Sequence, residues 1–158
     1  MTEAVLEKLR GLPFAQGMEP HQIGKLAALA TEVDFEKDQI IFREGDTHNQ
    51  FYVVLTGKVA LEITAKGRVF RVQTVEAGDE LGWSFMLAEA GKHFQARALR
   101  RVSALAFDGD QLQKACREDT AFGYELLSRI LRIVSSRLQA TRLRILEIYA
   151  PEVDLPTS

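Results

Sequence analysis

Residues 78–98 decide the fold, and they read GDELGWSFMLAEAGKHFQARA. A glycine turn leads to the carboxylate of Glu80, then to the small residue Gly82, then to a single predicted helical turn and a strand. Gly82 lets backbone N–H groups approach an anion closely, and a helix that starts at residues 82–84 would point unpaired N–H donors at it. Lys92 would supply the counter-charge. These parts predict a site for a phosphate.

Glu80 adds a second requirement to this candidate site. An ionised carboxylate only accepts hydrogen bonds, so it suits a hydroxyl and not a phosphate. A ligand that carries both groups, such as a sugar phosphate or a nucleotide, would satisfy the stretch. The alternative is ordinary turn chemistry before a short helix.

Length and composition restrict the class of protein. The chain has 158 residues, a formal net charge of −2 and one cysteine. This length fits one domain with a sizeable core, and near-neutral charge gives no global reason to expect nucleic-acid binding. No apolar run reaches the roughly 20 residues that a membrane span needs. Cys116 cannot form an internal disulfide and is interpreted as a small buried side chain in a cytoplasmic protein.

The middle of the chain has the pattern of a β-roll. From Val33 to Phe107, short β-rich runs alternate with turn residues at roughly 8–12-residue spacing, which is typical of a sandwich or barrel of about eight strands. We expect a mainly β protein with flanking helices, a double-stranded β-helix of the jelly-roll kind. The predicted strands include residues 39–43, 51–55, 59–63, 69–75, 95–101 and 103–107.

Helices are predicted on both sides of the roll. A short amphipathic helix covers residues 2–10, and a second begins at Pro20. After the roll, Asp108 can cap a short helix, with Gln111 completing a capping box. The division of the chain is then 1–117 for the roll with its helices, 118–150 for one long helix and 151–158 for a tail.

The long helix carries two apolar stripes. One is a heptad seam, whose members are Leu127, Leu131, Val134, Leu138, Thr141, Ile145 and Ile148. The other, beside it, contains Leu126, Ile130, Ile133 and Ala140. We expect the second stripe to pack on the roll and the seam to pack against an identical helix, which makes a homodimer. The alternative is that one domain buries both stripes.

Four spaced stretches make this order of elements resemble a known family. They are IIFREGD at 40–46, FYVVLTGKV at 51–59, GDELG at 78–82 and RLQAT at 137–141. Together they resemble the cyclic-nucleotide-binding domain of the catabolite activator and Fnr-type regulators, over about residues 12–150. The resemblance implies a stand-alone member of the Crp/Fnr family that binds a cyclic nucleotide, with cAMP as the first expectation.

The resemblance also implies a set of ligand residues. Glu80 matches the glutamate that takes the ribose hydroxyl, Gly82 the residue that gives its N–H to the cyclic phosphate, and Thr141 a helix residue that touches the base. Lys92, followed by His93, falls where the family has an arginine, and a lysine offers a point charge in place of a planar fork. Trp83 and Phe85 make the cradle bulkier than is usual. The full expected set is Glu80, Leu81, Gly82, Trp83, Ser84, Lys92, His93 and Thr141.

Several kinds of chemistry are not expected. The histidines lack metal-ligand spacing, no cysteine cluster would hold an iron–sulfur centre, and nothing singles out an axial ligand for haem. No nucleophile–base pair stands out, so we expect no enzyme. Five arginines of the long helix, Arg129, Arg132, Arg137, Arg142 and Arg144, are interpreted as a solvated face. Only residues 151–158 follow the long helix, so no helix-turn-helix domain and no specific DNA binding are expected.

Three functions remain open at this point. The favoured one is a homodimeric sensor that binds a cyclic nucleotide and passes the signal to a partner protein. The second is a dimeric interaction or scaffold subunit whose pocket takes no nucleotide. The third is a sensor for another small anion, such as a carboxylate metabolite.

Overall fold

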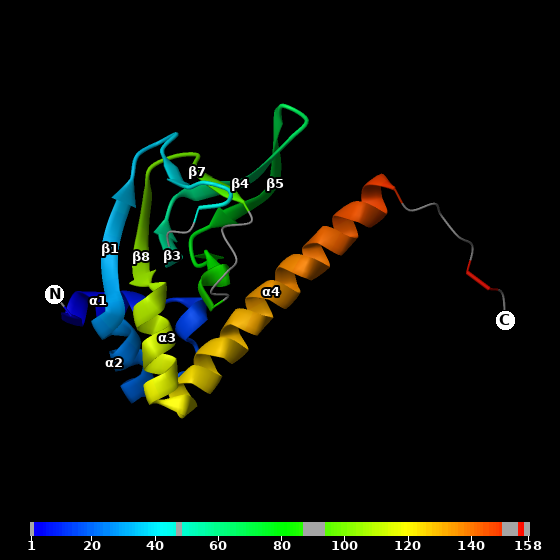
Figure 1. Ribbon diagram of the computed structural model, residues 1–158. Helices are drawn as coiled ribbons and strands as arrows, with labels where there is room; N and C mark the ends of the chain where they lie inside the picture. Colours follow the sequence, from blue (N-terminus) through cyan, green and yellow to red (C-terminus); the bar gives the residue numbers. More distant parts are fainter. Residues whose placement is uncertain (1, 47–48, 87–93, 150–154, 157–158) are drawn as a thin grey trace.

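The computed structural model describes residues 2–46, 49–86, 94–149 and 155–156, and its strands form two four-stranded antiparallel sheets (Figure 1). The sheet orders are β1-β8-β3-β6 and β2-β7-β4-β5. The helices are α1 (Thr2–Arg10), η1 (Pro13–Ala15), α2 (Pro20–Leu29), η2 (Trp83–Met86), α3 (Gly109–Glu118) and α4 (Thr120–Ile148). The strands are β1 (Ala30–Phe35), β2 (Ile40–Phe42), β3 (Gln50–Thr56), β4 (Lys58–Ala65), β5 (Arg68–Glu76), β6 (Glu80–Leu81), β7 (Gln95–Ala98) and β8 (Val102–Asp108).

The first sheet is the middle layer of the molecule. In β3, alternate side chains point to opposite faces, and both faces are covered. Phe51 and Val53 belong to the core shared with the helices, whereas Tyr52 and Val54 belong to the core shared with the second sheet. Burial on both sides explains why β3 reads as a continuous apolar run and not as an alternating one. The predicted roll with flanking helices is confirmed.

Several predicted boundaries were wrong, including those of one strand and of the long helix. The strand predicted over 95–101 ends at Ala98. The long helix, predicted from residue 118, begins at Thr120, because Asp119 lies outside it as its N-cap. One carboxylate oxygen of Asp119 accepts from the backbone N–H of Phe122 at 3.1 Å, and the other accepts from Lys25 Nζ at 2.7 Å. Asp119 therefore separates α3 from α4 and ties that junction to α2.

The long helix α4 places its two stripes in different surroundings. Leu126, Ile130 and Ile133 are buried against the roll and its helices, as predicted, although Ala140 is exposed. Most of the seam is exposed, from Leu127 to Ile148, and only Val134 is half-buried. The second half of α4 extends beyond the helical layer along the β4–β5 hairpin (Figure 1). The described part of one chain therefore does not bury both stripes, and that alternative is excluded.

Cys116 is buried in the core, as predicted. Burial raises the pKa of its thiol, with smaller effects from Arg117 and Asp119. A buried thiol held in its neutral form behaves as a small apolar side chain.

Candidate functional site

The turn at Gly82 is built as the sequence predicts. Gly82 has φ +80°, in the left-handed region that glycine adopts without strain, and the 3-10 helix η2 follows it directly. Phe85 is fully buried, and its ring lies 5.2 Å from that of Phe51. The Phe85 carbonyl accepts hydrogen bonds from the side-chain amides of Asn49 and Gln113. The expectation that Phe85 adds bulk to the pocket is wrong, because its ring anchors η2 in the core.

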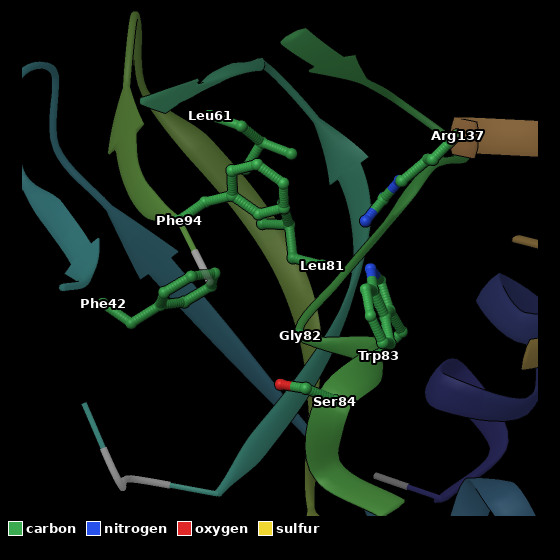
Figure 2. Close-up of a pocket in the computed structure, with 8 residues that line it drawn as sticks. All are labelled: Phe42, Leu61, Leu81, Gly82, Trp83, Ser84, Phe94 and Arg137. Atoms are coloured by element: carbon green, nitrogen blue, oxygen red, sulfur yellow. The ribbon is translucent and has the colours of Figure 1, made fainter. Parts of the chain in front are cut away.

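The pocket beside this turn is narrow and largely apolar. Its lining consists of Phe42, Leu61, Leu81, Gly82, Trp83, Ser84, Phe94 and Arg137. Figure 2 shows the rings of Phe42 and Phe94 on one side and Trp83 and Arg137 on the other. The volume of the pocket is about 20 Å³, which is close to the room that one water needs. No carboxylate belongs to the described lining.

Arg137 is the charged group among the described residues that line this pocket. It comes from α4, and its guanidinium points toward Trp83 (Figure 2) and donates a hydrogen bond to the Glu80 carbonyl. Burial lowers the pKa of Arg137, while the neighbouring carboxylates of Glu80 and Asp79 raise it. The interpretation of Arg137 as part of a solvated face was therefore wrong.

Arg129 is another arginine that does not belong to a solvated face. It is buried, donates from Nη1 to the Phe14 carbonyl at 2.6 Å and pairs through Nη2 with Glu125 at 2.7 Å. These contacts fix the first half of α4 to the η1 segment. Arg144, described below, also contacts the roll.

Glu80 lies on the other side of β6 from Leu81. Adjacent residues of a strand point to opposite faces, and the Glu80 side chain is half-buried in the space between β5 and α4, near Ile133 and Ser136. Burial raises the pKa of this carboxyl, and the nearby Arg137 lowers it by a smaller amount. The structure therefore brings Leu81, Gly82, Trp83 and Ser84 together in the pocket but leaves Glu80 outside its lining. Lys92 and His93 lie outside the described residues.

Thr141 lies in a wider groove between β5 and α4. This groove has a volume of about 370 Å³ and is lined by Arg71, Val72, Gln73, Thr74, Ala140, Thr141 and Arg144. The Thr141 hydroxyl donates to the Arg137 carbonyl at 2.9 Å, which is a local contact within the helix. Arg144 Nη1 donates to the Val72 carbonyl at 2.7 Å and so attaches the β4–β5 hairpin to α4.

Arg137 was the functional candidate that sequence reasoning missed. It follows Ile133 by four residues and Ile130 by seven, so it continues the stripe that packs on the roll. That spacing could have identified it, because a charged residue on a buried stripe must meet a partner. Arg137 was missed because the five arginines of the long helix were interpreted together as one solvated face.

The pocket offers donors and apolar surface. The Arg137 guanidinium, the Ser84 hydroxyl and the N–H groups of the Gly82 turn can meet an anion, and the rings can cover an apolar group. In the part of the chain that is described, no group of three or more histidine, cysteine, aspartate or glutamate residues could hold a metal ion. None of the described helices combines the length and the apolar character that a bilayer crossing requires.

Comparison with known proteins gives a consistent result. The model of the cyclic nucleotide-binding domain family matches residues 32–119. The Thermus thermophilus cyclic AMP receptor protein is 28% identical over 147 residues, which cover 93% of this chain and 63% of that protein. The Mycobacterium tuberculosis CRP-like cAMP-activated global transcriptional regulator is 26% identical over 139 residues, 87% of this chain and 60% of that protein. The chain thus spans about 60% of the length of these regulators.

A solved structure supports the same fold. A cyclic nucleotide-binding domain from Methylobacillus flagellatus superimposes with a TM-score of 0.81 at 19% identity, covering 97% of this chain and 86% of that one.

Proposed function

We propose, from the premise that this chain belongs to the cyclic nucleotide-binding domain family, that it is a homodimeric regulatory sensor. In this proposal the pocket at Gly82 binds a cyclic nucleotide, and α4 passes the bound state to a partner protein. The related regulators carry cyclic AMP in their names, which makes cAMP the first ligand to test.

The observation that carries the proposal is the position of Arg137. Its guanidinium enters the pocket beside the Gly82 turn, and its backbone belongs to the helix with the exposed seam. Any ligand that displaces or recruits this guanidinium therefore acts directly on α4. Arg137 can serve a sensor only if the ligand binds two arrangements of α4 with different affinities.

The residues fit one half of a cyclic nucleotide better than the other. Arg137, Ser84 and the turn N–H groups suit the phosphate, whereas the described lining offers no carboxylate for the ribose hydroxyl. Ligand pockets usually have volumes of roughly 300–1,000 Å³, so a nucleotide requires the Phe94 ring to move aside and the Arg137 guanidinium to shift onto the phosphate. Arg137 would then have to leave the Glu80 carbonyl.

The seam supports the dimer in this proposal. Leu131, Leu138 and Ile145 are exposed at heptad spacing, and large apolar side chains in such a row gain free energy when a second helix covers them. A second copy supplies the same row in the same spacing.

Isothermal titration calorimetry with cAMP and with cGMP is the decisive experiment. We expect saturable binding of one of them, and a loss of affinity of roughly 10- to 150-fold in Arg137→Gln, the value of one charge-assisted hydrogen bond. Arg132→Gln, an exposed arginine on the same helix, is the matched control and should bind normally. Absence of heat with both nucleotides at millimolar concentration would reject the nucleotide sensor.

A second candidate function has its own support. The pocket volume of about 20 Å³ and the rings of Phe42, Trp83 and Phe94 favour an interaction subunit whose pocket takes no nucleotide. In that case the dimer would form, neither nucleotide would bind, and Trp83→Ala would leave partner binding unchanged. A thermal-shift screen of small carboxylates would distinguish a sensor of another anion from the nucleotide sensor and from the interaction subunit. A ligand at 100 times its dissociation constant adds about 2.7 kcal/mol to the stability of the protein that binds it.

A further inference from the structure

We propose that a cavity between η1 and the first half of α4, called the η1 cavity below, binds a small zwitterion with an apolar body, such as an apolar α-amino acid. The ammonium group of this ligand would meet the Glu80 carboxylate, and its carboxylate would meet the Arg132 guanidinium. The inference goes beyond the proposed function, because it requires neither a nucleotide in the pocket at Gly82 nor the dimer.

The η1 cavity is separate from the pocket at Gly82. It has a volume of about 140 Å³ and is lined by Pro13, Phe14, Glu80, Arg129, Arg132 and Ile133. None of these residues belongs to the described lining of the pocket at Gly82. An apolar cavity of roughly 150 Å³ can hold a molecule the size of benzene. The apolar part of a small amino acid therefore fits the η1 cavity.

Contacts on two sides hold the walls of the η1 cavity in place. Arg129 is buried, donates from Nη1 to the Phe14 carbonyl at 2.6 Å and pairs with Glu125 at 2.7 Å. Pro13 packs against Gly78, where an added Cβ would lie 3.4 Å from the Pro13 Cδ atom. Because η1 is fixed both to α4 and to the turn before β6, the cavity is formed without a ligand, and binding requires little ordering of the chain.

Two residues of opposite charge line the η1 cavity without an ion pair. Among the ion pairs of the described chain, none includes Glu80 or Arg132, whereas Arg129 is neutralised by Glu125. Arg137 lowers the pKa of the Glu80 carboxyl, but burial raises it by more. The neighbouring charge therefore does not fully compensate this carboxylate for its lost hydration, and a cationic group of a ligand would do so.

The lining favours a molecule that carries both charges. Pro13, Phe14 and Ile133 supply apolar contact surface. The Glu80 carboxylate can accept hydrogen bonds from an ammonium group, and the planar guanidinium of Arg132 can bind a carboxylate. A plain carboxylate would bring a second negative charge close to Glu80, and a plain amine would bring a positive charge close to the arginines of the cavity. A zwitterion avoids both repulsions.

Titration of the isotope-labelled full chain with L-leucine, followed by amide NMR, tests both the affinity and the place of binding. We expect the amide signals of Phe14 and Ile133, which line the η1 cavity, to shift until they saturate. The signals of Leu61 and Ser84, which line the pocket at Gly82, should stay unchanged.

Changes in the ligand and in the chain test the two charged contacts. Isocaproate, which is leucine without its ammonium group, should bind roughly 10- to 150-fold more weakly, and Glu80→Gln should weaken L-leucine to a similar degree. Isoamylamine, which is leucine without its carboxylate, and the variant Arg132→Gln should each lose about 2- to 5-fold, because Arg132 is exposed and its charge is screened by water. Arg142→Gln is the matched control, since Arg142 is exposed on the same helix and does not line the η1 cavity. It should bind L-leucine as the wild type does.

The absence of a saturable shift with L-leucine would overturn this inference, as would shifts confined to the residues of the pocket at Gly82. Equal binding of L-leucine and isocaproate would reject the contact with Glu80 and with it the zwitterion. Equal losses in Arg132→Gln and Arg142→Gln would reject the contact with Arg132. None of these results bears on the proposed sensor, which the nucleotide titrations test separately.

Discussion

At the scale of single residues, two arginines of α4 connect the helix to the rest of the fold, Arg129 from a buried position and Arg137 from a half-buried one. Arg129 and Arg137 both reach from the helix into the roll and its flanking segments and donate to backbone carbonyls. A carbonyl that loses such a donor inside the protein is left unsatisfied, which costs more than the net value of the bond. These arginines therefore fix how the helix sits on the roll.

Replacing Arg129 should destabilise the fold. Arg129→Met keeps much of the side-chain volume but leaves the Phe14 carbonyl without its 2.6 Å partner. We expect a loss of about 1.5–3 kcal/mol in the free energy of unfolding, the range for hydrogen bonds to charged groups. Urea denaturation measures it, with the exposed Arg132→Met as control. Equal stability of the two variants would show that the buried contact contributes nothing.

The carboxyl of Glu80 should make stability depend on pH. Its pKa is raised from the ordinary value of 4.5, mainly by burial. The folded state therefore holds this proton more tightly than the unfolded state, so stability falls as pH rises from that value through the raised pKa. Glu80→Gln removes this effect.

We expect Glu80→Gln to be more stable than the wild type at pH 7, with the difference shrinking as the pH is lowered toward 4.5. Thermal unfolding at a series of pH values measures the difference. A difference that stays constant over the series would contradict the burial of this carboxylate.

Some residue-level features were readable from the sequence and others were not. The burial of Cys116 was predicted because a lone cysteine without an activating basic neighbour behaves as a small apolar side chain. Glu80 was predicted to lie in the pocket because it is close to Gly82 along the chain. In a strand, however, side chains alternate between the two faces, and this alternation decides which way the Glu80 side chain points. Glu80 and Leu81 are neighbours, so only one of them can face the pocket.

At the scale of elements, α3 and α4 are in close contact at Gly123. A Cβ added at Gly123 would lie 2.8 Å from the Cys116 carbonyl oxygen and 3.1 Å from the Cys116 Cβ. A glycine inside a helix normally weakens it relative to alanine. Here the missing side chain permits the two helices to approach.

This close approach predicts opposite results for two similar substitutions. Gly123→Ala should destabilise the fold by about 1–3 kcal/mol through overpacking. Gly24→Ala in α2, where the added Cβ would meet nothing within 4 Å, should stabilise it by up to about 1 kcal/mol. Urea denaturation of both variants gives the signs. A stabilising Gly123→Ala would show that the helices can separate at little cost.

Element types were predicted more reliably than element ends. The strands and helices followed from apolar periodicity and from turn residues. The start of α4 was misplaced because negative residues favour both the first turn of a helix and its N-cap. Only the contacts of Asp119 with Phe122 and Lys25 distinguish the two.

At the scale of the whole molecule, the exposed seam predicts how the chain associates. Leu138 is 50% exposed and lies in the seam, whereas Leu143 is 52% exposed and lies outside it. Leu138→Arg should therefore convert a dimer to a monomer, while Leu143→Arg should leave the dimer intact. Light scattering coupled to size-exclusion chromatography measures the mass of each variant. Dissociation by both variants to the same degree would place the contact elsewhere.

The sequence predicted the fold and the exposed seam because both depend on periodicity. It could not predict how small the pocket is, since that depends on the side-chain arrangements of Phe42, Phe94 and Arg137, which come from distant parts of the chain. The grouping of Arg71 with Arg144 depends likewise on the packing of a hairpin against a helix.

Because α4 is long and uninterrupted, a small tilt at its first turn produces a larger displacement at its far end. From the close crossing at Gly123 to Tyr149 there are 26 residues (149 − 123), or roughly 40 Å at 1.5 Å per residue. A swing of only about 5° at that pivot would carry the far end through roughly 3 Å. A small shift of the Arg137 contact with the roll would thus become a larger displacement at the far end of α4.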